Sequence, residues 1–405
     1  MSVEQVVVHA SPPPIWSSIR EALRGSHQDF TTGSLNRAIL LLAIPMVLEM
    51  VLESLFAVVD VFWVGRLGAD AIATVGLTES MLSLVMAIGF GLSLSTTAMV
   101  ARRIGEKDPA GAAVAGVQAI AMRLLWVSNI INLILDPCLI FGWGPFPKLG
   151  VTGAALATFT GRSIGVLYQF YRLLRGSERL RILRSQLRVN LGVLLRLLRV
   201  SLTGILQFLI AHTSWIGLVR IVSVFGSDAL AGYTIAIRIL IFILLPSWGL
   251  SNAAATLVGQ NLGAKQPERA QISVWRTGFY NMLFLGIIGV IFLVFATPVI
   301  RLFTNDPAVV PLAATCLRIL SYGNIAYAYG MVMLQAFNGA GDTVTPTWVH
   351  FFGFWLLEIP LAYFLAIPRH VGANGVYISI VVAEAAIAIA GVFLFRRGRW
   401  KGQQI

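Results

Sequence analysis

The stretch "LEMVLESLFAVVDVFW", residues 48–63, decides the fold class, because it is a hydrophobic run that also carries three carboxylates. With its flanks it extends over about residues 38–64, and a membrane helix needs roughly 20 mostly apolar residues. A helix advances roughly 100° per residue, so Glu49, Glu53 and Asp60 share one narrow face. Charged side chains inside a membrane span almost always face the protein interior or a wet cavity. The stretch therefore predicts a membrane helix whose acidic face lines a cavity.

The composition of the whole chain agrees with a membrane protein that has many spans. Of its 405 residues, 57% are hydrophobic and only 12% are charged, and the mean hydropathy is +0.80. A soluble domain carries about 25% charged residues and cannot hide this much apolar surface. The apolar runs are long and continuous, which predicts an all-α polytopic protein and not a β-barrel. The ten predicted spans are residues 38–64, 76–101, 120–143, 151–172, 196–224, 231–260, 276–300, 312–338, 346–367 and 372–395.

The net charge of +12 is concentrated in alternate loops between these spans. Residues 172–199 hold eight arginines, and further basic residues follow the second, sixth and last spans. Basic residues mark the cytoplasmic loops of membrane proteins. The pattern predicts a multi-pass protein of the cell (inner) membrane with both termini in the cytoplasm, and it accounts for the charge without a nucleic-acid partner. Residues 1–33 lack the pattern of a secretory signal peptide, so none is expected.

Nothing in the sequence indicates an enzyme. Cys138 and Cys316 lie in hydrophobic runs, and the five scattered histidines form no ligand cluster. A Walker motif is absent, so ATP is not expected as the direct energy source. No nucleophile–base pair or metal motif stands out. We therefore expect no cofactor beyond Na⁺ or H⁺ as a coupling ion, with small-molecule substrates, the lipid bilayer as the surroundings and a monomeric state.

An internal repeat divides the chain into two homologous halves. "GADAIATVGL" at residues 68–77 returns as "GSDALAGYTI" at 226–235, and "RIGEKDP" at 103–109 returns as "NLGAKQP" at 261–267. Both pairs have an offset of 158, and the same offset aligns Glu49 with Gln207. Parallel repeats of this kind are typical of transporters, with the binding site between or within the halves.

The repeat is interrupted in the first half. "LILDPCLIF" at residues 133–141 resembles "LLEIPLAYF" at 356–364 with an offset of 223, so the first half has 65 fewer residues. That difference amounts to one two-helix hairpin at roughly 20 residues per span, and the break falls near Ala121–Met122. The predicted domains are an N-terminal cytoplasmic tail (1–34), a first lobe of four spans (35–175), an Arg-rich linker (176–195), a second lobe of six spans (196–396) and a C-terminal tail (397–405).

Five motifs between about Leu35 and Phe395 resemble those of MATE (multidrug and toxic compound extrusion) transporters. They are "LAIPMVLEMVLESLFAVVDVFWVGRLGADAIATVGL", "ARRIGEKDP", "VGQNLGAKQP", "AFNGAGDTVTPTWV" and "NLILDPCLIFGWGPFPKLGVTGAALAT". The resemblance implies two six-helix lobes around a central cavity and export of cationic or amphipathic compounds in exchange for Na⁺ or H⁺. This chain departs from the family pattern by lacking the third and fourth helices of the first lobe.

The resemblance also assigns a coupling site. Asp60 in "VVDVFWVG" matches the first-helix aspartate that the family uses for cation or proton coupling, and Asn132 and Asp136 in "NLILDP" match its fifth-helix partners. Residues four apart share a helix face. Thr158 in "GAALAT" adds an oxygen, and a Na⁺ ion at Asp60, Asn132 and Asp136 is the one metal site expected.

Further polar residues inside the predicted spans are cavity candidates. Glu358 takes roughly the place of Asp136 in the second half, and intramembrane acids often mark ion pathways. The structural alternatives are ion pairs with Arg123 or Arg162 for the acids and helix–helix hydrogen bonds for a histidine. The cavity candidates are Glu49, Glu53, Glu358, His212 and Arg238, and the prolines expected to bend spans are Pro45, Pro246 and Pro360.

The pattern as a whole predicts a secondary active exporter that works by alternating access. One alternative is a lipid-linked precursor flippase of the same superfamily, although the first lobe is acidic where a flippase has a basic cavity. A membrane enzyme would need converging His, Asp or Ser groups near an interface. The last alternative is an inactive deletion product, since the first lobe has only four spans. The sequence names neither the exported compound nor the coupling ion.

Overall fold

The computed structural model describes residues 20–22, 30–65, 87, 89–91, 93–94, 97–107, 131, 134–175 and 191–403. These residues form helices and the turns between them, and no strand occurs among them. The first half contributes α2 (Leu35–Gly65) and α5 (Val151–Arg175). The second half contributes α6 (Leu191–Val222), η2 (Ser223–Phe225), α7 (Ser227–Gly263), α8 (Pro267–Arg301), α9 (Val309–Ser321), α10 (Asn324–Ala340), α11 (Val344–His350), η3 (Phe351–Glu358), α12 (Ile359–Ala366), α13 (Ala373–Arg396) and η4 (Arg399–Gly402).

Within the described residues, six helices are long and apolar enough to cross a membrane. The pair α9 and α10 makes a seventh if it is counted as one span, although the two are bent by 53°. This break corrects the predicted continuous span 312–338. The buried Asn324 side chain at the break donates a hydrogen bond to the Leu285 carbonyl oxygen at 3.2 Å. The predicted spans 76–101 and 120–143 lie largely outside the described residues.

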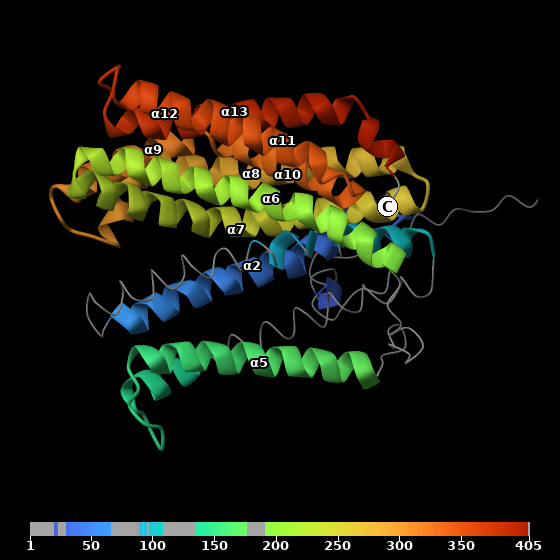
Figure 1. Cartoon of the computed structure of the whole chain (residues 1–405), viewed down its shortest axis with the longest axis horizontal. Helices are drawn as coiled ribbons and strands as arrows, with labels where there is room; N and C mark the ends of the chain where they lie inside the picture. The colour runs from blue at the N-terminus through green and yellow to red at the C-terminus, as the bar shows by residue number, and fades with distance from the viewer. Residues whose placement is uncertain are drawn as a thin grey trace, which may run out of the picture.

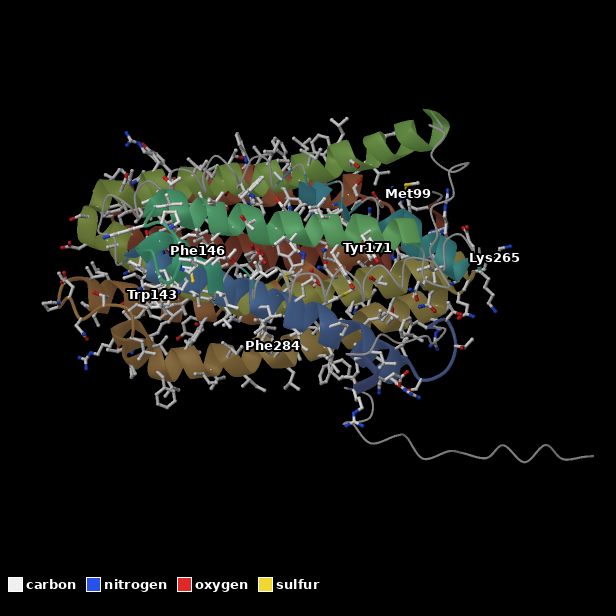
Figure 2. The ribbon with its side chains drawn as sticks, turned by 90° about the horizontal axis from the view of Figure 1, so that it is seen from below. Met99, Trp143, Phe146, Tyr171, Lys265 and Phe284 are labelled. Carbon is white, nitrogen blue, oxygen red and sulfur yellow. The ribbon has the colours of Figure 1, made fainter. Side chains whose placement is uncertain are left out.

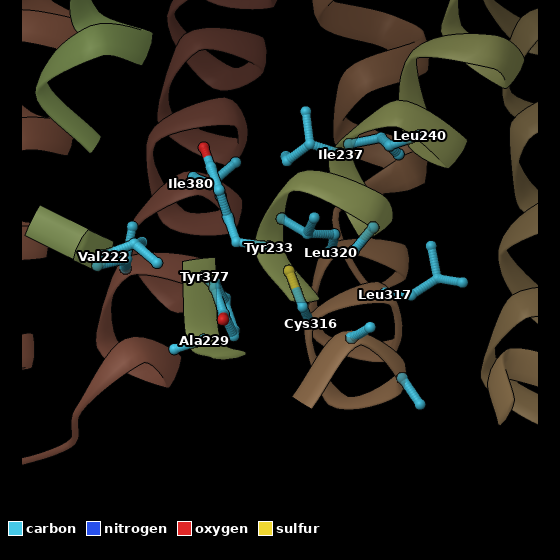
Figure 3. Packing of buried hydrophobic residues seen from close by; sticks show 14 of the residues in the cluster. Val222, Ala229, Tyr233, Ile237, Leu240, Cys316, Leu317, Leu320, Tyr377 and Ile380 are labelled. Carbon is cyan, nitrogen blue, oxygen red and sulfur yellow. The ribbon is translucent and has the colours of Figure 1, made fainter. Parts of the chain in front are cut away.

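The helices of the second half pack as one bundle (Figure 1). Its largest hydrophobic cluster joins α7, α9 and α13 around Tyr233, Cys316 and Tyr377 (Figure 3). The rings of Tyr233 and Tyr377 stack with centroids 6.0 Å apart and planes within 6°. A Cβ atom at Gly232 would lie 3.0 Å from the Ala313 backbone nitrogen, so glycine permits the close approach of α7 and α9.

One kink of the bundle lies near a proline that the sequence analysis did not select. α2 passes through Pro45 and α7 through Pro246 as single helices. The non-helical residue inside α8 is Phe295, with φ −108° and ψ 22°, three residues before Pro298. A proline inside a helix lacks the N–H donor and its ring clashes with the carbonyl four residues back, which accounts for this kink.

The span 344–366 contains a π-helical segment. It consists of α11, η3 and α12 in sequence, and η3 is the π-helical part. The Ile359 N–H donates to the Phe354 carbonyl oxygen, five residues back instead of four. Pro360 follows directly, where it interrupts the ordinary hydrogen-bond ladder. π-Helical turns occur frequently at functional sites, and Glu358 is the last residue of this one.

Helix α2 of the first half packs against α7 of the second, while α5 lies beyond α2 (Figure 1). Ile39 and Leu42 of α2 form a buried cluster with Ala253 and Leu257 of α7. The entry to α2 is tied to α8, because the Arg269 guanidinium donates to the carbonyl oxygens of Phe30 and Thr32 at 3.3 and 3.0 Å. The acidic face of α2 is thereby fixed relative to the second half.

The residues after α13, predicted as a tail, also pack onto the protein. Trp400 in η4 is fully buried, and its ring stacks on Phe395 with centroids 4.6 Å apart. Lys401 forms an ion pair with Glu268 of α8 at 2.8 Å. The Arg102 guanidinium donates to the Gln403 carbonyl oxygen at 2.7 Å, so this segment connects the two halves.

Candidate functional site

The second-half bundle contains a cavity of about 350 Å³. Side chains from α6, α7, α10, α11, η3 and α13 line it. Most of the wall is apolar or aromatic, and two carboxylates and two histidines are set into it. An apolar pocket with a few convergent polar groups is the usual form of a small-molecule site. This cavity is therefore the candidate functional site that the described residues define.

Glu358 is the most buried acid in this cavity, with 2% of its surface exposed. The Ser214 hydroxyl of α6 donates a hydrogen bond to its Oε2 at 2.6 Å. Nearby, the Trp355 indole N–H donates to the Ile210 carbonyl oxygen at 3.2 Å, which fastens η3 to α6. Among the described residues, no Lys or Arg forms an ion pair with Glu358. The predicted cavity residue Glu358 thus lies in the cavity, with the Ser214 hydroxyl as its hydrogen-bond donor.

Glu384 enters the same cavity from α13 and is half-buried. Tyr327 of α10 lines the cavity together with Glu384. Like Glu358, Glu384 forms no ion pair with a Lys or Arg among the described residues. The sequence analysis missed Glu384 and Tyr327. An acid inside the apolar run "YISIVVAEAAIAIA" was the available signal, and it is the same signal that selected Glu49.

Two histidines complete the polar lining. His212 of α6, a predicted cavity residue, holds its Nδ1 3.0 Å from the Phe208 carbonyl oxygen and lines the cavity. His350, the last residue of α11, lines it from the side of η3 and was not predicted. Gln207, which the repeat offset aligns with Glu49, lines it as well. Arg238 is exposed on α7 and is not part of this lining.

Aromatic rings form one wall of the cavity and link it to the first half. Phe208 of α6 and Trp248 of α7 both line the cavity and stack at 5.6 Å with planes within 7°. Phe90 of the first half stacks on Phe208 at 5.0 Å and on Trp248 at 6.1 Å. Aromatic faces attract cations through the ring quadrupole. The wall therefore suits a ligand that carries positive charge on an apolar body.

The acidic face of α2 is only partly described. Glu49 and Glu53 are half-buried, and Glu53 Oε1 lies 3.1 Å from a guanidinium nitrogen of Arg162 on α5. The side chains of Arg162 and Glu53 remain 51% and 32% exposed. This ion pair joins α2 to α5, which is the structural alternative that the sequence analysis left open for such acids.

The predicted coupling site stays a prediction. The side chain of Asp60 and the whole of Asn132 lie outside the described residues. Asp136 is fully buried, and Thr158 on α5 is half-buried.

Figure 2 shows the two ends of the molecule: Trp143 and Phe146 lie at the opposite end from Lys265.

The chain matches the MatE family model twice, over residues 45–138 and over residues 203–364. Together the two matches cover more than half of the chain. The first spans 94 residues and the second 162, so the first is 68 residues shorter. That difference agrees in size with the hairpin that the repeat analysis finds missing from the first half.

Curated relatives carry related names. A "Probable multidrug resistance protein NorM" of Thermotoga maritima is 27% identical over 297 residues, which is 72% of this chain and 62% of the relative. One of the same name from Mesorhizobium japonicum is 24% identical over 444 residues, covering 89% and 93%. A "FAD transporter" of Shewanella oneidensis is 26% identical over 280 residues, covering 68% and 60%. The chain spans about three fifths of the length of the first relatives.

Solved structures share the fold. "Crystal structure of MATE in complex with MaL6" superposes with a TM-score of 0.83 at 23% identity, covering 94% of this chain and 98% of that one. "Crystal structure of MATE in the bent conformation" gives 0.80 at 23% identity, covering 95% and 97%. These similarities confirm the predicted fold class, an all-α membrane protein with two homologous helical lobes.

Proposed function

Because this chain belongs to the MatE family, we propose that it is a secondary active exporter of cationic or amphipathic small molecules. Relatives named as multidrug resistance proteins support export of varied compounds. The relative named as an FAD transporter raises the alternative of an anionic substrate. The described cavity disfavours an anion, because its two carboxylates have no basic partner among the described residues.

The observation that carries the proposal is the composition of the second-half cavity. Glu358 and Glu384 supply negative charge, while Phe208, Trp215 and Trp248 supply aromatic surface. An intramembrane charge costs about 2.5–3.5 kcal/mol at a helix centre on insertion scales, so a neutralising partner is favoured. A cation that contacts aromatic faces gains about 0.5–2 kcal/mol, depending on its desolvation. The volume of about 350 Å³ lies within the range of small-molecule pockets.

We propose that Asp60, Asn132, Asp136 and Thr158 hold the coupling Na⁺ or H⁺ in the first half. Exchange of this ion for the substrate supplies the energy, and alternating access moves both across the cell membrane. The basic residues in alternate loops support a placement with both termini in the cytoplasm. The proposal includes a monomer in the lipid bilayer and no nucleic-acid partner.

Two other functions remain as outcomes of a test. A flippase for lipid-linked precursors would favour a basic cavity, and the described one is acidic. An inactive deletion product would fold and insert but transport nothing, because the first half lacks one hairpin.

The test is transport of tetraphenylphosphonium into proteoliposomes under an imposed Na⁺ or H⁺ gradient. We expect one of the two gradients to drive transport by the wild type, which identifies the coupling ion. Asp60→Asn is expected to lose this gradient-driven transport. Glu268→Gln is the matched control, because its exposed acid lies outside the proposed sites. Equal driven transport in Asp60→Asn and wild type removes the role of Asp60. No driven transport by the wild type removes the export proposal.

A further inference from the structure

A second cavity lies where α2 of the first half meets α8 of the second. It has a volume of about 340 Å³ and is lined by Asn36 of α2 and by Trp275, Arg276, Phe279 and Tyr280 of α8. The Arg276 guanidinium donates a hydrogen bond to the Asn36 side-chain oxygen at 2.9 Å. This cavity shares no lining residue with the candidate functional site, so it is a separate space.

Positive charge gathers at this second cavity without acids to balance it. Arg276 has the neutral Asn36 amide as its partner, and the Arg396 guanidinium lies 5.5 Å from the centroid of the Trp275 ring. Among the described residues, neither arginine forms an ion pair with an Asp or Glu. A guanidinium presents its N–H donors in a fixed fork that matches the oxygens of a phosphate group. The cavity is therefore suited to an anion.

The cavity lies at the depth of the lipid headgroups. α2 and α8 begin, and α13 ends, at the same end of the molecule (Figure 1). Arg276 stands at the start of the predicted span 276–300, and Trp275 and Tyr280 lie next to it on α8. Trp and Tyr are enriched at the boundary between the membrane and water. Arg276 is thereby placed at this boundary, on the side where α2 begins.

An apolar surface continues from the cavity along the outside of α8. Its side chains recur every three or four residues, which places them on one helix face. Each is more than half exposed: Phe279, Leu283, Ile287, Val290 and Val294. An exposed apolar surface of this kind marks contact with a membrane. A molecule with an anionic head and apolar chains can place its head beside Arg276 and its chains along this surface.

From this arrangement we propose that the second cavity binds the phosphodiester headgroup of an anionic phospholipid, from the leaflet on the side where α2 begins. Arg276 donates to the phosphate oxygens, and the Asn36 side-chain amide can donate as well while its oxygen accepts from Arg276. Basic pockets between helices near a membrane surface bind anionic lipid heads in this way. Because Asn36 belongs to the first half and Arg276 to the second, the bound lipid joins the two halves. This binding requires a chain that spans a membrane, but it does not require export.

Native mass spectrometry of the detergent-purified chain tests the site directly. Dioleoylphosphatidylglycerol and dioleoylphosphatidylcholine are titrated in turn, because they have the same acyl chains and differ in net charge. We expect the first phosphatidylglycerol to bind the wild type about tenfold more tightly than phosphatidylcholine, and Arg276→Gln to lose about that factor. Arg301→Gln is the matched control, because it removes an exposed arginine from the other end of the same helix. Equal binding of the two lipids to the wild type, or equal loss in the two variants, overturns the proposal.

Asn36→Asp separates lipid binding from helix packing. The new carboxylate preserves a partner for Arg276 and hence the link between α2 and α8, but it neutralises the guanidinium and repels a phosphate. We expect this variant to retain the melting temperature of the wild type and to lose its preference for phosphatidylglycerol. An unchanged preference would mean that Arg276 only holds the two helices together, which overturns the proposal. This variant remains decisive if Arg276→Gln fails to fold.

Inorganic phosphate distinguishes a lipid from a soluble anion. We expect phosphatidylglycerol to raise the melting temperature of the wild type and of Arg301→Gln but not of Arg276→Gln. Inorganic phosphate at the same concentration is expected to raise none of the three. Equal protection by inorganic phosphate overturns the lipid site in favour of a soluble anion. No gradient is used in these measurements, so failure of export leaves the lipid site intact, and failure of lipid binding leaves the export proposal intact.

Discussion

Gly263 at the end of α7 lies directly against the backbone of Arg102 in the first half, so that a Cβ atom on the glycine would overlap the Arg102 carbonyl oxygen. The reverse contact is also present, because a Cβ atom on Gly105 would overlap the Gln260 carbonyl oxygen. The repeat offset of 158 converts Gly105 into Gly263 and Arg102 into Gln260. The two contacts are therefore copies of each other, related by the pseudo-symmetry of the halves.

Other contacts between the halves follow the same rule. Gly259 packs against Ala101, and the offset of 158 aligns these two residues with each other. A local pseudo-two-fold axis consequently passes between these two residues. Closer to the middle of the helices, a Cβ atom on Gly249 would lie 2.8 Å from the Val47 nitrogen, and one on Gly91 would lie 2.5 Å from the Ile205 nitrogen. These contacts are again related by 158.

The first prediction concerns the contacts that Gly263 and Gly105 make between the two halves. Gly263→Ala is expected to lower the melting temperature in detergent, because overpacking costs about 1–3 kcal/mol. By the pseudo-symmetry, Gly105→Ala is expected to cost about as much. Gly286→Ala in α8 is the matched control: a Cβ atom there meets nothing within 4 Å, and alanine favours a helix interior by about 0.5–1 kcal/mol over glycine. Differential scanning fluorimetry measures the melting temperature of all three variants. An equal change in melting temperature for Gly263→Ala and Gly286→Ala would contradict the close packing of Gly263 on the Arg102 backbone.

The second prediction concerns the ion pair between α2 and α5. A double-mutant cycle of Glu53→Gln and Arg162→Gln is expected to give a coupling energy below about 1 kcal/mol, because partly exposed ion pairs contribute little. Glu53→Gln is expected to retain gradient-driven transport, because the Glu53 carboxylate forms a weak ion pair between two helices and lies outside the proposed coupling site. Loss of transport in Glu53→Gln but not in Arg162→Gln would instead assign Glu53 to the coupling machinery.

Long-range periodicity in the sequence predicted much of this fold. The 158-residue offset identified two halves, and it also relates the glycine contacts that join them. The break between α9 and α10 was not predicted, because hydropathy stays high through Tyr322 and Gly323. The π-helical segment of residues 351–358 was not predicted either, since it differs from an α-helix only in hydrogen-bond register.

The candidate cavity was harder to predict than the fold. Glu358 and Ser214 are 144 positions apart, so their contact depends on how η3 packs on α6. Glu384 lies in no recognised motif, and an isolated acid in an apolar run does not indicate which helix it faces. Tyr327 and His350 acquire importance only through their places in this cavity. Single-residue signals thus locate intramembrane polar groups, while their grouping requires the tertiary structure.

The third prediction concerns a buried polar link beside the cavity. Asn281 of α8 accepts a hydrogen bond from the Ser247 hydroxyl at 2.8 Å and donates one to the Ala328 carbonyl oxygen at 3.0 Å. Asn281→Ala is expected to destabilise the protein by about 1–3 kcal/mol, because it removes two buried side-chain hydrogen bonds and leaves the Ser247 hydroxyl with the Met331 sulfur at 3.6 Å as its acceptor. Asn305→Ala is the control at an exposed position. Equal melting temperatures for the two variants would show that the link contributes no stability.

The last prediction concerns the segment after α13. Trp400→Ala removes a fully buried ring that stacks on Phe395 and whose indole N–H donates to the Phe395 carbonyl oxygen at 2.9 Å. Truncation of a buried tryptophan to alanine costs about 3–5 kcal/mol, so a marked fall in melting temperature is expected. Trp143→Ala, at a position 54% exposed, is expected to cost much less. Because Gln403 accepts a hydrogen bond from Arg102, Trp400→Ala should also make the segment more accessible to protease. Unchanged proteolysis together with an unchanged melting temperature would mean that this segment does not hold the two halves together.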